Sequence, residues 1–296
     1  MTDTNAYANA DTNTHADADT NAPTAPREIW HLPTQHLGRT VLVYSQLTST
    51  NTHAADLAAS QGRVVDGWVI LADVQTAGRG QHGRRWLASA GASVLMSVVL
   101  YPPAHLNRPA ILTAWAGVSV TELVWQVCHR HAQLKWPNDV LLAGKKVCGI
   151  LIEQQRQATI VGIGVNVQQS AADFAAVQLP EAGSLRMCCA DAPVPPTVAV
   201  ARSLIEILDQ QYALLCGQPQ AGLADLEQRW SARLGLLARR VRVELTDGSR
   251  HTGWVQRLTL AGLTLAAYPG VDRDDDDTSD PPAEWPCESI RHVTAD

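Results

Sequence analysis

Apolar and polar residues along the chain form two recurring patterns between Arg39 and Val167. Short apolar runs predict strands over 40–45, 68–73, 93–101, 139–144, 147–154 and 158–167. A helix is expected over 49–62, because it would open at a Ser/Thr/Asn cap and stop at a glycine. The longest helix should run from Pro109 to Val127, where apolar residues recur at helical spacing. Strands alternating with helices predict an α/β domain.

The pattern changes in the last third of the chain. Helices are expected over 197–215 and 221–235. Beyond Leu237 the chain shows short alternating strands, with Asp247-Gly248 as a hairpin turn, which is typical of a small all-β domain. Its acidic run, 272–280, is expected to be a solvated loop. The predicted organisation is therefore a tail over 1–26, a catalytic domain over 27–236 and a small domain over 237–296.

Composition narrows the class of protein. The chain has 296 residues, 46% of them hydrophobic, and a formal net charge of −6, which argues against broad nucleic-acid or membrane-surface binding. Residues 1–26 consist almost only of Thr, Asn, Ala and Asp, so we expect disorder there. No apolar run approaches the ~18–20 residues of a membrane span, and the N-terminus lacks a signal-peptide layout. These features predict a cytoplasmic protein without a membrane segment.

The cysteines and histidines suggest no special chemistry. None of the six cysteines forms a C-x-x-C pair, and Cys188 and Cys189 are adjacent, so all six are expected to be reduced thiols. Cys148, two residues after Lys146, is a candidate for a place near a binding pocket. His129 and His131 follow a helix end, where histidines are common without a metal.

The stretch GRGQHG over 78–83 matches the G-x-G-x-x-G pattern of a dinucleotide-binding turn. A predicted strand precedes it, but no helical stripe follows. No Asp or Glu occurs from Val74 through Thr121, so the ribose-binding carboxylate of that fold is missing. The stretch is not a P-loop either, because G-x-x-x-x-G-K-S/T is absent. The dinucleotide interpretation is rejected.

The same stretch favours a bound anion. Arg79, Arg84 and Arg85 stand in a segment without local acids, and arginine forks suit carboxylate and phosphate oxygens. The glycines would allow positive φ angles and a close approach of backbone to ligand. The alternative is a flexible surface loop with solvated arginines.

Two further stretches lie in the same predicted domain. LKWPNDVLLAGKKVCGILIE (134–153) places Lys145 and Lys146 at the mouth of an apolar strand, where a lysine either extends to solvent or holds charge that develops on a reacting acyl or phosphoryl group. VGIGVNV (161–167) is a glycine-rich strand, which suggests that a ligand or another backbone comes close.

Together these segments resemble a known family. STN (49–51), Q-x-x-GRGxxGRxW (75–86), KWPNDxxxxxxKVCGIL (135–151), GIGVNV (162–167) and SIR (289–291) are similar in content and order to motifs of biotin protein ligases, over roughly residues 39–295. The resemblance implies a mixed-sheet α/β (α+β) catalytic domain, class II aminoacyl-tRNA synthetase/biotin ligase-like, followed by a small SH3-like β-barrel. It also implies an activity: biotin reacts with ATP to give biotinyl-5′-AMP, and a lysine of a biotin carboxyl-carrier protein then displaces AMP.

The resemblance also assigns residues. It implies a catalytic role for Lys146 and Arg79. Biotin-binding positions are Ser49, Thr50, Asn51, Gln75, Arg79, Gly80, Gln81, Lys146 and Gly149. ATP-binding positions are Gly78, Arg84, Trp86, Trp136, Asn138, Asp139, Asn166 and Arg291. Asp139 would help to hold Mg²⁺ through water.

This sequence departs from the family at two places. Gln81 stands where arginine is frequent, which makes the loop less basic and bears on how the intermediate is retained. Glu288 precedes the terminal arginine without the usual spacing, so Arg291 is the stronger assignment. Residues before Arg39 are too few for the DNA-binding domain of some members, so no DNA binding is expected. The alternatives are a lipoate or octanoate ligase or transferase and a nucleotide-dependent regulatory protein; a monomer and a homodimer are equally compatible.

Overall fold

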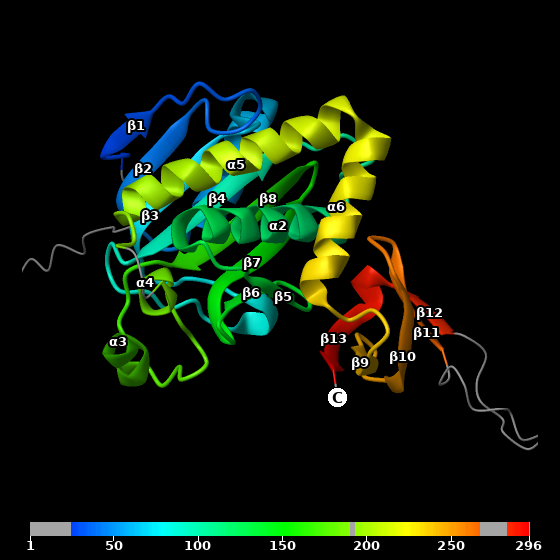
Figure 1. The fold of residues 1–296 in the computed structure, drawn as a ribbon. Helices are drawn as coiled ribbons and strands as arrows, with labels where there is room; N and C mark the ends of the chain where they lie inside the picture. Colours follow the sequence, from blue (N-terminus) through cyan, green and yellow to red (C-terminus); the bar gives the residue numbers. More distant parts are fainter. Residues whose placement is uncertain (1–24, 190–192, 267–282, 296) are drawn as a thin grey trace, which may run out of the picture.

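The computed structural model describes residues 25–189, 193–266 and 283–295. The expected disordered tail, apart from its last two residues, and the expected acidic loop at 272–280 lie outside these residues. Figure 1 shows a large sheet with helices lying across it and a smaller sheet at the C-terminal end.

The large sheet has eight strands in the order β1-β2-β3-β4-β8-β7-β6-β5. Only β2 and β3 pair in parallel, so the sheet is mixed, as expected. Its strands are β1 Glu28–Trp30, β2 Val41–Leu47, β3 Val69–Gln75, β4 Ser93–Leu100, β5 Gln133–Lys135, β6 Asp139–Leu142, β7 Lys145–Gln155 and β8 Ala158–Asn166. The six strands predicted from apolar runs are therefore confirmed, while the short strands β1 and β5 were not predicted.

Helices occupy both faces of this sheet. They are α1 Thr50–Gln61, α2 Pro109–Cys128, α3 Ala171–Ala176, α4 Leu185–Cys188, α5 Thr197–Gly217 and α6 Pro219–Leu234. Alternate residues of β2 belong to two separate apolar clusters. Val41 and Val43 pack with α2 and α5, whereas Leu42 and Tyr44 pack with α1. α1 thus lies on the opposite face of the sheet from α2 and α5.

The long apolar helix α2 is a core helix. Its length and composition would suit a membrane span, but 72% of its most apolar 18 residues are buried inside the protein. It begins at Pro109 and ends at Cys128, and the C-cap residue His129 has the left-handed conformation, with a φ of 50°. Trp115, fully buried in its middle, donates from Nε1 to the carbonyl oxygen of Leu208 on α5.

The small sheet is antiparallel throughout, in the order β12-β11-β10-β9-β13. Its strands are β9 Arg240–Leu245, β10 Arg250–Leu258, β11 Gly262–Ala266, β12 Ala283–Pro286 and β13 Ile290–Ala295. This arrangement fits the expected SH3-like module, although no pairing of β12 with β13 closes a barrel within the described residues. Figure 1 shows α6 leading from the helical layer to this sheet.

One expectation about the cysteines is wrong. Cys128, at the end of α2, is joined by a disulfide to Cys189, just after α4, with the two Cα atoms 5.0 Å apart. The sequence excluded only a bridge between the adjacent Cys188 and Cys189. It could not show that α4 folds back onto the end of α2 and brings in a partner 61 residues away.

Candidate active site

The beginning of α1 forms a buried polar wall. Ser49, Thr50 and Asn51 are each no more than 4% exposed. Ser49 is the N-cap residue, yet its side chain makes no capping hydrogen bond. Gln75, at the end of β3, takes that role because its Oε1 accepts from Thr50 N at 2.7 Å and from Thr50 Oγ1 at 3.1 Å. The helix start is therefore held by a side chain from the neighbouring strand.

Asn51 is fixed from three sides. A Cβ on Gly162 of β8 would lie 2.3 Å from Asn51 Oδ1, so glycine is required there for Asn51 to approach the sheet. Ser97 Oγ donates to Asn51 Oδ1 at 2.5 Å, and Asn51 Nδ2 donates to Glu153 Oε2 at 2.7 Å. The glycine-rich strand thus admits a close side chain, in accord with the sequence interpretation.

Glu153 also reaches the arginine loop. Its Oε2 lies 2.7 Å from Arg79 Nη2, an ion pair spanning 74 residues of sequence. The lack of acids within the segment therefore does not leave the charge of Arg79 unpaired. The local absence of acids is real, but Glu153 of β7 supplies a carboxylate from another part of the fold.

The loop itself is a narrow hairpin. Trp86 N donates to Gly78 O at 3.0 Å, and Gly80 N donates to Arg84 O at 2.7 Å. At the tip, His82 and Gly83 have φ angles of 56° and 74°. Of the three glycines, only Gly83 uses a positive φ. Gly78 is needed for space instead, since a Cβ there would lie 2.5 Å from Trp86 O.

Trp86 lies against a floor made of two paired glycines. Gly149 of β7 and Gly164 of β8 are register partners, and a Cβ on either would lie 2.8 Å or 2.6 Å from the indole. Lys146 Nζ lies 5.7 Å from the Trp86 ring centre, a cation–π distance. Trp86 Nε1 is buried and has no hydrogen-bond partner among the described residues.

Lys146 lies at the entrance of β7, as the sequence suggested. Its Nζ forms an ion pair with Asp139 Oδ1 at 2.6 Å, and both side chains are partly buried. Its backbone pairs with the segment 178–183, because Lys146 N donates to Glu181 O and Gly183 N donates to Lys146 O, each at 2.9 Å. Lys145 points to this segment too, and its Nζ donates to Pro180 O at 2.8 Å. Of the two lysines, Lys146 lines the cavity described below.

Three predicted residues are engaged in positioning contacts. Trp136 Nε1 donates to Ile290 O at 3.2 Å, which ties the turn after β5 to the C-terminal sheet. Asn138 Nδ2 donates to Ile150 O at 2.5 Å. Asn166 Nδ2 donates to Gly183 O at 3.0 Å and so supports the segment that pairs with Lys146.

These segments enclose one cavity of about 660 Å³. Most predicted site residues line it: Ser49, Thr50, Asn51, Gln75, Arg79, Gly80, Gln81, Arg84, Trp86, Trp136, Asn138, Asp139, Lys146, Gly149 and Asn166. Gly78 and Arg291 do not. Arg291 Nη1 lies 3.6 Å from Glu244 Oε1, and the next residue, His292, lines the cavity instead.

Cys148 is fully buried in the apolar cluster on the α2 face and does not line the cavity; burial raises the pKa of its thiol.

Among the charged residues of the cavity lining, cations outnumber carboxylates. Its described lysines and arginines are Arg79, Arg84, Arg85, Lys135 and Lys146, whereas its carboxylates are Asp139 and Glu181. Burial lowers the pKa of His292, against the opposing effect of Glu244, and the nearby Arg291, His82 and Arg84 lower it further. A cavity with small buried polar groups at one end and a cationic lining elsewhere suits an anionic ligand with a compact neutral part.

Several residues that line the cavity were not predicted from the sequence. His82 and His292 have ring centres 6.3 Å apart and connect the loop to β13. The segment 178–182 forms a wall of the cavity, although no motif in the sequence marks it. No cluster of three or more His, Cys, Asp or Glu that could hold a metal occurs in the part of the chain that the structure describes.

Sequence comparisons place this chain among biotin ligases. A family model for the Biotin/lipoate A/B protein ligase family matches residues 42–170. A biotin–[acetyl-CoA-carboxylase] ligase of Mycobacterium tuberculosis is 36% identical over 71% of this chain and 77% of its own length. The bifunctional ligase/repressor BirA of Bacillus subtilis is 37% identical over 48% of this chain, and the match spans only about half of that relative, 45% of its length.

Solved structures agree on the fold. A biotin protein ligase from Aquifex aeolicus in complex with biotin and ATP aligns with a TM-score of 0.67 at 22% identity, covering 86% of this chain and 99% of that one. A biotin protein ligase from Leishmania major in complex with biotinyl-5-AMP aligns with a TM-score of 0.52 at 21% identity, covering 72% of this chain and 97% of that one.

Proposed function

The chain belongs to the biotin protein ligases of the Biotin/lipoate A/B protein ligase family, and we propose that it joins biotin to a carrier protein at the expense of ATP. The observation that carries the proposal is that Lys146 and the arginine loop line one cavity together with the buried Ser49–Asn51 wall. A neutral ring with a carboxylate tail, and a nucleotide whose phosphate reacts with that tail, need these two environments side by side.

The Ser49–Asn51 wall is suited to the ureido ring of biotin. Hydroxyl and amide groups can both donate and accept, which a ureido group requires. Gln75 and Ser97 hold Thr50 and Asn51 in fixed positions, so a bound ring would meet prearranged groups. Arg79 and Gly80 would close over this ring from the loop. Glu153 holds both Asn51 and Arg79 and would couple loop closure to the pocket.

Lys146 would stabilise charge in the adenylation step. A carboxylate oxygen of biotin forms a bond to the α-phosphorus of ATP, and the bond to pyrophosphate breaks. Negative charge grows on the α-phosphate oxygens, and an ammonium group in a partly desolvated site can stabilise it. Arg84, which lines the same cavity, would bind the polyphosphate. In the second step a neutral lysine amine of the carrier attacks the acyl carbon, and AMP leaves.

The proposed reaction would also require Mg²⁺, bound together with ATP. This ion usually binds one or two protein carboxylates and keeps substrate phosphates and water as its other ligands. Asp139, one of the two carboxylates that line the cavity, fits such a role and would act beside its ion pair with Lys146. The ion would neutralise phosphate charge, while Lys146 and Arg84 hold the oxygens.

We further propose a cytoplasmic enzyme with two domains, bounded as 27–236 and 237–296. Its protein substrate would be a biotin carboxyl-carrier protein of acetyl-CoA carboxylase or a related carboxylase. The helical layer ends at Leu234 and the small sheet begins at Arg240, which supports this boundary.

The test is a single incubation with Mg²⁺-ATP and one acid at a time: biotin, lipoate or octanoate. Mass spectrometry would detect the acyl-adenylate. We expect biotinyl-5′-AMP only, and Lys146→Ala should reduce its rate by about 10²–10³ through loss of transition-state charge stabilisation. Lys145→Ala is the matched control, since its ammonium contacts Pro180 O and does not line the cavity. A lipoyl or octanoyl adenylate would replace the proposed substrate with that of the sister enzymes.

A further inference from the structure

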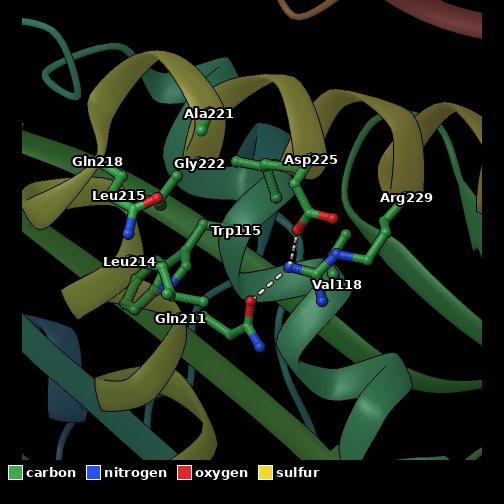
Figure 2. A pocket seen from close by; sticks show the side chains of 11 residues that line it. Trp115, Val118, Gln211, Leu214, Leu215, Gln218, Ala221, Gly222, Asp225 and Arg229 are labelled. Atoms are coloured by element: carbon green, nitrogen blue, oxygen red, sulfur yellow. Dashed lines mark hydrogen bonds and ion pairs between the residues drawn. The ribbon is translucent and has the colours of Figure 1, made fainter.

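A second cavity, of about 330 Å³, lies among α2, α5 and α6 (Figure 2). It shares no lining residue with the candidate active site in the described chain. The two also lie on opposite faces of the large sheet, because α2 and α5 cover the face that α1 does not. This cavity therefore needs its own explanation.

Its inner surface is apolar. Trp115 and Val118 of α2 and Leu215 and Leu226 of the other two helices are buried and line it. Gly222 permits the close crossing of α5 and α6, since a Cβ there would lie 3.0 Å from Leu214 O and 3.2 Å from Leu215 Cα. The two helices diverge around this contact, and an indole and aliphatic side chains line the space between them.

The guanidinium group of Arg229 lies at one end of the cavity, and some of its N–H groups are not used in contacts described for this cavity. Figure 2 shows Arg229 between Gln211 and Asp225. Its Nη2 donates to Gln211 Oε1 and lies 2.8 Å from Asp225 Oδ2. Its Nε is buried and has no hydrogen-bond partner among the described residues. The cavity does not reach this Nε, but the Arg229 side chain as a whole is 33% exposed, so its terminal N–H groups can donate to a ligand oxygen.

From these contacts we propose a second binding site for a small molecule with a flat or branched apolar body and a carboxylate or carbonyl oxygen. The apolar body fills the space against Trp115, and the oxygen accepts from Arg229. A cation is disfavoured, because Arg229 is already there and Asp225 is already paired with it. The volume is at the lower end of the ~300–1,000 Å³ typical of small-molecule sites.

The ligand would touch a helix that also reaches the candidate active site. Close to Arg229, α6 contacts both the main cavity and the C-terminal sheet. Trp230 packs on Trp136 with ring centres 5.8 Å apart, and Glu227 Oε2 accepts from Leu260 N at 2.8 Å. The second site therefore lies next to the residues that join the C-terminal sheet to the main cavity.

The experiment uses protein labelled with 5-fluorotryptophan and three probes of similar shape: phenylacetate, phenylacetamide and phenethylamine. The ¹⁹F resonance of Trp115 reports on this cavity, whereas those of Trp86 and Trp136 report on the candidate active site. We expect saturable shifts of Trp115 with the acid or the amide and none with the amine. Arg229→Gln should weaken binding by about tenfold or more, as expected for loss of a charge-assisted hydrogen bond.

Arg233→Gln is the matched control. Arg233 lies one turn further along α6, pairs with His131 and does not line the cavity, so this variant should bind like the parent protein. If Arg229→Gln fails to fold, Ala221→Phe at the cavity mouth should block the same shifts. Binding of the amine equal to that of the acid, no loss in Arg229→Gln or Ala221→Phe, or no shift of Trp115 at millimolar probe would each overturn the proposal.

Discussion

The contact between Trp86 and its glycine floor makes a sharp prediction about the arginine loop. Replacing Gly164 with alanine would put a Cβ 2.6 Å from Trp86 Cε2 and 2.8 Å from Cζ2. Carbon atoms prefer separations of ~3.5–4.0 Å, so the indole must lift by about 1 Å. The backbone itself should tolerate the change, because Gly164 lies in a regular strand without a positive φ.

The magnitude follows from the area that Trp86 covers. A tryptophan side chain buries up to ~250 Å² when enclosed, and Trp86 is half-buried, so ~100 Å² at ~25 cal/mol per Å² gives about 2.5 kcal/mol for the whole contact. A displacement of ~1 Å would forfeit roughly half of that, about 1.3 kcal/mol. The closed state of the loop should then become about tenfold less favoured. The free energy of unfolding of the whole protein should change by less than ~1 kcal/mol.

Trypsin provides the assay, because Arg79, Arg84 and Arg85 all lie in the loop. Quantitative mass spectrometry would follow cleavage after Arg84 and Arg85, which reports the population of the open loop when opening is fast relative to cleavage. We expect cleavage about tenfold faster in Gly164→Ala, and protection when biotin is added. Gly217→Ala, whose Cβ meets nothing within 4 Å, is the control. Equal cleavage rates in Gly164→Ala and the parent would refute the glycine-floor argument.

Three further outcomes are expected. Asp209→Ala should lower the free energy of unfolding by about 3 kcal/mol in denaturant titrations, because the buried carboxylate accepts hydrogen bonds from the backbone N–H groups of residues 35–37. Glu206→Ala, on an exposed part of α5, is the control and should change this free energy little. Trp136→Phe removes the hydrogen bond to Ile290 O, worth ~1 kcal/mol, and should speed hydrogen exchange in β13 about fivefold; no change would count against this tie. Burial lowers the pKa of His53 from its ordinary 6.5, against the opposing effect of Asp56, so the unfolded chain binds more protons below that value and stability falls as the pH drops through about 6.5. In thermal melts His53→Gln should reduce this dependence, and an identical pH profile would contradict the assignment.

The large elements were predictable because their signals are local. Apolar runs gave the long strands and helical spacing gave α2 within one residue, since each pattern needs only neighbouring positions. The strands that were missed, β1 and β5, have only three residues each and depend on partners elsewhere in the sheet. Their sequence holds too few positions for a period to appear.

The candidate site was predictable as motifs but not as contacts. Glu153 illustrates the limit: it lies in an apolar strand and belongs to no charged pattern, yet it joins Asn51 to Arg79. Gln75 likewise caps a helix that begins 25 residues before it. Such pairings depend on which strands become neighbours, and pattern along the chain does not contain that information.

The local geometry of β13 explains why His292, and not the predicted Arg291, lines the cavity. The pairing of β13 with β9 shifts register between Ile290 and His292, so the regular alternation of side chains is interrupted at Arg291. His292 is the register partner of Glu244 on β9, and its ring lies near that of His82, whereas Arg291 lies in the irregular step and keeps its Nη1 3.6 Å from Glu244 Oε1. A motif identifies the segment that reaches a site, whereas the register of the strand decides which side chain enters it. If Arg291 does contact nucleotide, β13 must change its register or Arg291 must leave Glu244, and an Arg291→Gln variant with unaltered ATP affinity would favour the present arrangement with His292 at the cavity.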